Sequence, residues 1–166
     1  MDRVGLAILE QELAADAAVM ADAARLAAER LADEHPGHLS ACGYELNRMY
    51  NVLEKSFERL CQAFENHFEK AGDYHERLLE RMSLDLPGIR PPFLPSDFRS
   101  RVRELKSFRH FFRHAYDPIL RVDRLAELVT DARGVSSAFP TWTRHFSDAV
   151  RQELDKGGEI RDGSGF

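Results

Sequence analysis

The sequence predicts an all-α protein, an antiparallel bundle of four to five helices, and three observations support this fold class. Apolar residues recur at steps of three or four along most of the chain, no segment shows sustained period-two alternation, and the breaks between the periodic stretches are short. The chain has 166 residues, of which 43% are hydrophobic and 31% charged. That composition can supply a buried core and argues against wholesale disorder.

The first predicted helix covers residues 1–34. Its apolar stripe consists of Leu6, Leu9, Leu13, Ala17, Met20, Ala24, Ala27 and Leu31. This spacing places the stripe on one helix face, and the alanines between its members have high helix propensity. The segment EHPGH at 34–38 should end the helix, because proline and glycine break helical structure.

A second long helix is predicted over about 39–71, followed by a short one at 74–84. The stripe of the long helix consists of Leu46, Met49, Leu53, Phe57, Leu60, Phe64 and Phe68. The next segment, PGIRPPFLPSD, contains four prolines within nine residues. We therefore expect a stiff loop there rather than a helix.

Two more helices complete the predicted bundle. Ser96 should cap a helix whose stripe is Phe98, Val102, Leu105, Phe108, Phe112 and Ala115. That helix should end near residues 114–116, because Asp117 precedes Pro118 and is biased towards extended backbone. The last helix is predicted over 122–155, with Pro140 kinking or restarting it.

We expect one helical domain over residues 1–155, in which 1–34 form a long N-terminal helix and 35–155 the core, followed by a disordered tail at 156–166. The N-terminus lacks the features of a signal peptide, and no apolar run approaches the roughly 20 residues that span a bilayer. Cys42 and Cys61 have no metal-ligand spacing, so we expect small, buried, reduced thiols. These features predict a cytoplasmic protein without a membrane segment.

The charge distribution is uneven. The net charge of −5 argues against a nucleic-acid binder, but residues 99–124 carry eight basic residues against three acidic ones. This local excess of positive charge can attract a polyanion, since screening confines each field to about 8–10 Å at physiological salt. The alternative is a solvated helix face whose arginines pair with acidic neighbours.

The segment SFRHFFRHAYDP at 107–118 holds the candidate site. His110 and His114 are an i, i+4 pair, about 6 Å apart on one helix face, which is a spacing that can bind a metal. The motif lacks the glutamate of a zincin, however, and Arg109 and Arg113 repel a cation. We predict no metal site and keep a metal-dependent hydrolase using the two histidines as a third hypothesis.

Arg109 and His114 form a second pair, which suits phosphodiester chemistry. Histidine can move the proton of a ribose hydroxyl near neutral pH, and arginine stabilises the extra negative charge of the transition state. A straight helix separates the two by about 140°. They could converge if the helix frays at its end, or a second subunit could supply the missing half. Alternatively, His114 caps the helix and Arg109 pairs with a glutamate.

The residues Arg109-His110-Phe111-Phe112-Arg113-His114-Ala115-Tyr116 resemble the Arg-x4-His-x-Tyr motif of HepT-like toxins in the HEPN superfamily. His110 matches the polar residue that follows the arginine in those proteins. The stretch beginning CGYELNRMYNVL and the segment LPGIRPPFLP also resemble a HepT-like subgroup, so the similarity extends over about residues 35–150.

This resemblance implies a homodimeric, metal-independent ribonuclease toxin that needs no cofactor. Arg109 and His114 would be the catalytic pair, supported by His110 and Arg113. The RNA substrate would meet the basic residues Arg99, Arg103 and Lys106. A minimal nucleotidyltransferase antitoxin, MntA, would transfer AMP onto the motif tyrosine, here Tyr116.

Two alternatives to this reading stay open. Related four-helix modules serve as non-catalytic partners of nucleotidyltransferases, so the chain could be a binding module without nuclease activity. Tyr116 could instead be an aromatic residue that packs against the next helix with its hydroxyl at the rim.

Overall fold

The structure, a computed structural model, describes residues 1–65, 73–114 and 119–157 and is helical with no strand in these ranges. Its elements are α1 Arg3–Leu31, α2 His38–Glu65, α3 Tyr74–Met82, the 3-10 helix Ser96–Phe98, α4 Arg99–His114 and α5 Val122–Asp155. The predicted all-α class is confirmed. Of the expected disordered tail at 156–166, residues 158–166 lie outside the described residues. The extent of the domain stays a prediction.

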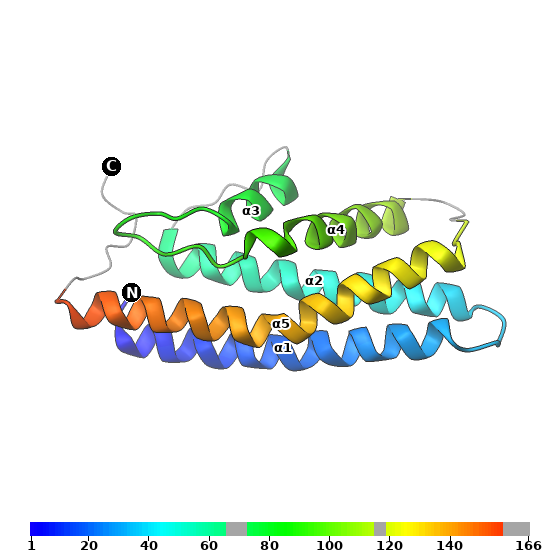
Figure 1. Cartoon of the computed structure of the whole chain (residues 1–166), viewed down its shortest axis with the longest axis horizontal. Coiled ribbons are helices and arrows are strands. Elements are labelled where there is room, and N and C mark those ends of the chain that lie inside the picture. The colour runs from blue at the N-terminus through cyan, green and yellow to red at the C-terminus, as the bar shows by residue number, and fades with distance from the viewer. Residues whose placement is uncertain (66–72, 115–118, 158–166) are drawn as a thin grey trace.

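Four helices form the bundle, and each runs opposite to its neighbour in the chain (Figure 1). α1 packs against α2 and α5, and α4 packs against the same two helices. The short helix α3 lies beside α4 and α2. The site-bearing helix α4 is thus held between α2 and α5, with α3 along its side.

α1 is an integral part of the core. Its N-terminus is capped by Asp2, whose carboxylate accepts a hydrogen bond from the Gly5 amide at 2.7 Å. Its apolar stripe is buried, with the members Leu6, Leu9, Leu13, Met20, Ala23, Ala24 and Ala27. The small alanines of this stripe let α2 and α5 approach closely, and α1 packs against both helices.

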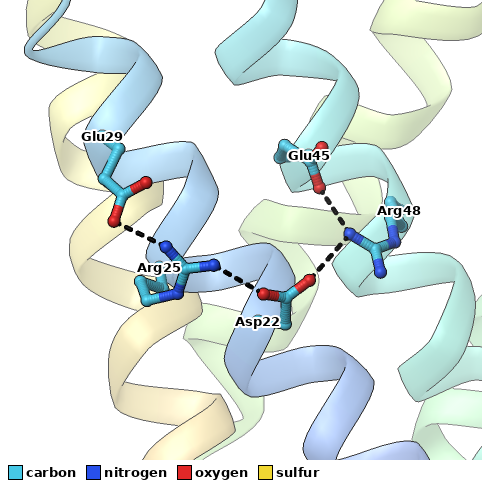
Figure 2. A network of polar contacts seen from close by, with 5 residues as sticks. All are labelled: Asp22, Arg25, Glu29, Glu45 and Arg48. Carbon is cyan, nitrogen blue, oxygen red and sulfur yellow. Dashed lines mark hydrogen bonds and ion pairs between the residues drawn. The ribbon is translucent and has the colours of Figure 1, made fainter.

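Charged residues join α1 to α2 along their exposed edge (Figure 2). Asp22 of α1 accepts from Arg25 at 2.7 Å within its own helix and from Arg48 of α2 at 3.3 Å, while Arg48 also donates to Glu45 at 3.0 Å. The hydrogen bond from Arg25 holds the pKa of Asp22 below its usual value. Because these groups are only partly buried, the network specifies the register of the two helices more than it adds stability.

The proline-rich segment at 83–98 is tied to the bundle by a buried ion pair. The Arg90 side chain is fully buried and contacts Glu65 of α2 at 2.7 Å. It also donates to the carbonyl oxygens of Arg81 at 2.8 Å and Pro91 at 3.1 Å. Gly88 (φ 76°) makes the turn that returns the chain to this position.

Phe93, at the centre of the same segment, fastens it to α2 and α5. Its ring makes edge contacts with four other aromatic rings, at centroid distances of 5.5–6.3 Å, those of Phe57, Phe139, Trp142 and Phe146. A loop without helical hydrogen bonds thereby gains a fixed path across the bundle.

The predicted cap at Ser96 differs from the structure, whereas of the two effects predicted for Pro140, a kink or a restart, the structure has the kink. The Ser96 hydroxyl donates to its neighbour Asp97, and Ser96 itself begins a 3-10 turn instead of capping α4. α5 continues through Pro140 without restarting, and its axis bends near the middle of its length (Figure 1). A bend without a break is one way a helix accommodates an internal proline.

Removing the buried arginine should destabilise the fold strongly. We expect Arg90→Ala to lower the free energy of unfolding by about 3 kcal/mol, since the buried Glu65 carboxylate would lose its fully buried partner and keep the partly exposed Arg81. Urea denaturation followed by circular dichroism measures this. The partly exposed Arg124, which pairs with Glu127 at 2.9 Å and also with Glu104, is the control, and Arg124→Ala should cost about 1 kcal/mol or less. Equal effects of the two substitutions would contradict the assigned role of Arg90.

The cysteines should be chemically silent in the native protein. Both are free and buried, and burial raises the pKa of Cys42 to about 11 and that of Cys61 to about 12. Only the thiolate reacts, so a thiol reagent at about pH 8 should label neither cysteine in buffer and both in urea. Rapid stoichiometric labelling of the folded protein would refute this expectation.

Candidate active site

Arg109 lies on the buried face of α4. It is adjacent to the core residues Leu105 and Phe108 and is only 8% exposed. His114, five residues later, is turned about 140° around the helix axis and is exposed. In one chain, the two predicted catalytic side chains therefore lie on different faces of α4.

Three side chains from two other helices hold the Arg109 guanidinium. Its Nε donates to Asn51 Oδ1 of α2 at 3.1 Å, and its Nη1 donates to Nε2 of His75 in α3 at 3.2 Å. Its Nη2 lies 3.6 Å from Glu54 Oε1 of α2. A buried cation needs such partners, because removing it from water costs several kcal/mol.

Glu54 and His75 form a pair of their own beside the arginine. Oε2 of Glu54 lies 2.7 Å from Nδ1 of His75, and Glu54 is only 8% exposed. Arginine can only donate, so His75 Nε2 accepts from it and the proton of the neutral ring lies on Nδ1, where it is donated to Glu54. Burial, and after it the charge of Glu54, raise the pKa of the neighbouring Tyr50 well above its usual value.

His110 and His114 stack on the exposed face of α4. Their ring centroids are 4.4 Å apart, with 28° between the planes. His114 Nδ1 lies 2.8 Å from the His110 carbonyl oxygen, which can only accept, so Nδ1 donates and Nε2 is the free nitrogen. Arg113 is exposed in the same last turn, where a cation is favoured by the helix dipole.

The end of α4 is fixed to α2 by a close contact. A Cβ atom at Gly43 would lie 2.6 Å from the Phe112 ring. This distance is too short for a non-bonded contact, so a side chain at position 43 would displace the ring. Gly43 therefore makes room for Phe112, and Phe112 in turn stacks on Phe108 at 5.5 Å. This contact sets the position of the motif relative to α2.

The basic residues of α4 are largely engaged with carboxylates. Arg103 donates to Glu76 of α3 at 2.7 Å, and Lys106 contacts the same carboxylate. Arg101 lies 3.8 Å from Asp131 of α5. Of the three predicted RNA-binding residues, Arg103 and Lys106 share one acidic partner, while the half-buried Arg99 lines a groove beside Trp142.

An apolar surface adjoins the stacked histidines. Phe111 of α4 is 44% exposed, and Ile119 and Val122, before and at the start of α5, are 86% and 55% exposed. Phe111 and Ile119 line a groove of about 320 Å³ with Arg121 and Arg124 on its rim. Rings and branched side chains this exposed are typical of an interaction surface.

The alternative in which Arg109 pairs with a glutamate and His114 caps the helix matches the structure, where Glu54 lies beside Arg109 and His114 contacts the His110 carbonyl oxygen. Sequence reasoning did not identify which glutamate, and it missed Asn51 and His75. Asn51, Glu54 and His75 lie 34 to 58 residues away from it in the chain. One signal was present, since Glu54 stands at helical spacing from the buried Tyr50 and Phe57 and so interrupts the apolar face of α2. Tyr116 lies outside the described residues.

The described part of the chain holds neither a metal-ligand cluster nor a membrane-spanning helix. No group of three or more His, Cys, Asp or Glu side chains comes together as a metal-ligand set within residues 1–65, 73–114 and 119–157. The stacked rings of His110 and His114 face one another, whereas two ligands of one ion would aim their lone pairs at a common point. No helix in the described part of the chain is long and apolar enough to cross a membrane.

Comparison with known proteins identifies the family. A search of curated proteins and a search of solved structures gave no significant match. The family model described as HepT-like protein matches residues 41–150, a range that includes α3, α4 and most of α2 and α5. The match covers well over half of the chain and contains the motif at 109–116. The chain therefore belongs to the HepT-like family of the HEPN superfamily.

Proposed function

We propose that this protein is the toxin of a toxin–antitoxin system, a metal-independent endoribonuclease that a partner nucleotidyltransferase neutralises by adding AMP to Tyr116. The observation that carries the proposal is the HepT-like match over residues 41–150, with the complete Arg-x4-His-x-Tyr motif inside it. The site of action would be the end of α4, where Arg109 and His114 lie.

Arg109 would stabilise the negative charge that develops on the phosphate in the transition state. His114 would transfer a proton through Nε2. Because the two side chains occupy different faces of α4, a shared cleft needs a second copy of the chain. Each copy would then place its exposed histidine near the arginine of the other. The homodimer implied by the family thus has a geometric reason in this chain.

The exposed apolar residues support that homodimer. Phe111, Ile119 and Val122 border the same end of α4 that carries the histidines. Burying them against a second copy would remove apolar surface from water, worth about 25 cal/mol per Å². The cleft would then form beside a hydrophobic contact, and RNA would reach it along Arg99, Arg103 and Lys106. Phosphates would have to compete with Glu76 for the last two.

AMP on Tyr116 would block this cleft by charge and bulk. Tyr116 follows His114 by two residues. A phosphodiester-linked adenosine there would add negative charge at a site built to receive RNA phosphate. An MntA-like partner would supply the chemistry.

One observation favours a second candidate function, a non-catalytic module that binds a nucleotidyltransferase. All three guanidinium nitrogens of Arg109 face partners within the chain, and its side chain is only 10% exposed. An arginine in that position could serve stability alone. The experiments below separate the two functions.

Nuclease activity should depend on His114. We expect the wild-type protein, expressed alone, to arrest growth and to cleave RNA in the presence of a chelator. His114→Ala should lower the cleavage rate by about 100- to 10,000-fold, the usual contribution of a general acid or base. His35→Ala is the matched control, since the His35 side chain is 88% exposed and lies outside the family match. A folded, unmodified wild type that neither arrests growth nor cleaves RNA would support the binding module instead.

Modification should map to Tyr116. We expect the protein co-expressed with its nucleotidyltransferase partner to gain the mass of AMP in intact-protein mass spectrometry. Tyr116→Phe should abolish the gain, because phenylalanine has no hydroxyl to accept the adenylyl group. Tyr44→Phe, at a tyrosine that is 59% exposed, should leave it unchanged. An AMP group retained in Tyr116→Phe would contradict the assignment.

A further inference from the structure

The pair of Glu54 and His75 takes no part in the function proposed above, although it lies directly against Arg109. We propose that His75, oriented by Glu54, is a second proton-transfer residue of the site and acts as the general base on the ribose 2′-hydroxyl. This inference rests on the proposed nuclease function and adds a residue outside the Arg-x4-His-x-Tyr motif. Three features of the pair carry it.

The first feature is the geometry of a base with its orienting carboxylate. Nδ1 of His75 donates to Glu54 Oε2 at 2.7 Å, so the basic nitrogen is Nε2 and it points at Arg109 Nη1, 3.2 Å away. A carboxylate on the far nitrogen fixes the tautomer and stabilises the imidazolium that forms when Nε2 takes a proton. An arginine beside the basic nitrogen can bind the phosphate that carries the attacked phosphorus.

The second feature is the difference in exposure within the cluster. The side chains of Glu54 and Arg109 are each 10% exposed, whereas that of His75 is 40% exposed. The orienting group is therefore buried and the proton-transferring group is open to solvent. A histidine that served only to hold the arginine in the core would gain nothing from this exposure.

The third feature is the ionic surroundings of His75. From α2 the group in contact with it is Glu54, beside which Tyr50 lies, and from α4 it is Arg109. In its own helix, the rings of Tyr74 and His75 form an edge-to-face pair with centroids 5.3 Å apart, and Glu76 is engaged by Arg103 and Lys106. Among these neighbours, Glu54 is the carboxylate in contact with the ring, so proton transfer at Nε2 is governed by this one partner.

The chemical step balances without any added reagent. Nε2 of His75 takes the proton of the 2′-hydroxyl, the 2′-oxygen forms a bond to phosphorus, and the bond from phosphorus to the 5′-oxygen breaks. The leaving 5′-oxygen takes a proton from the imidazolium form of His114, which the second copy of the chain supplies. The products are a 2′,3′-cyclic phosphate and a 5′-hydroxyl end. His75 finishes protonated and His114 neutral.

The hydrogen bond between Arg109 and His75 gives substrate binding a direct consequence. In the free protein, Nη1 occupies the lone pair of Nε2. A phosphate oxygen that takes over Nη1 leaves this lone pair free at the point where the ribose hydroxyl arrives. The roles of base and acid follow from the group that accepts the Nδ1 hydrogen bond of each histidine. In His75 this acceptor is the Glu54 carboxylate, which suits a base. In His114 it is the backbone carbonyl of His110, which suits an acid.

The test is the pH dependence of kcat/KM on a short fluorogenic RNA for the full-length protein. We expect His75→Gln to lower kcat/KM by about 100-fold or more and to remove the acidic limb of the profile. Glutamine can still accept from Arg109, so the arginine stays in place. We expect Glu54→Gln to move the acidic limb to lower pH, because the imidazolium loses its carboxylate. Added imidazole should partly restore His75→Ala, and His35→Gln is the control.

The outcomes separate this inference from the function on which it rests. Loss of cleavage in His114→Ala, with a normal rate and profile in His75→Gln, would overturn the role of His75 and leave the nuclease intact. A lower rate in His75→Gln with an unchanged profile and no imidazole rescue would also overturn it, by assigning His75 a structural role. A wild type that cleaves no RNA would overturn both proposals together.

Discussion

The buried guanidinium of Arg109 is the group around which this end of the bundle is built. A charge that is 8% exposed must find its partners within the protein, and they come from α2 and α3. Satisfying it fixes the distance between α2 and α4 and places the start of α3 against both. Phe112 on Gly43 reinforces the same contact from the apolar side. The position of His75, and with it the second half of the candidate site, follows from this one requirement.

The division of α4 into two faces explains why its motif mixes aromatic, cationic and imidazole groups. Phe108 and Phe112 continue the core stripe, and Arg109 lies beside them on the inner face. His110 and His114 lie on the outer face and stack on one another. A helical period of 3.6 residues makes this separation unavoidable for positions five apart. A chemistry that uses the outer-face His114 together with inner-face groups such as Arg109 and His75 must therefore take the histidine from a second copy of the chain.

Much of the fold was accessible from the sequence, because helix periodicity and proline positions are local signals. The stripes of α1 and α2 and the α4 stripe through Val102, Leu105 and Phe108 were predicted from spacing alone, and Pro118 indicated that α4 ends near residues 114–116. The 3-10 turn at Ser96 was not predicted, since its geometry depends on the packing of the proline-rich loop. A glutamate was foreseen as an alternative partner of Arg109, but not which one, and Asn51 and His75 were missed. Contacts between residues 34 to 58 positions apart depend on tertiary packing, and no sequence periodicity indicates them.

The same buried cluster bears on the choice between nuclease and binding module. An arginine held by three partners is costly to keep if its only task is stability, because apolar residues of similar volume often fill such sites at least as well. The buried Glu54 and the partly exposed His75 would then be two further ionisable groups with no role beyond holding the arginine. A polar cluster that opens to solvent through a histidine, beside a helix that carries two more, makes sense if a phosphate replaces one of its internal contacts. The free energy spent on burying these charges would then keep the site in its active geometry before RNA binds.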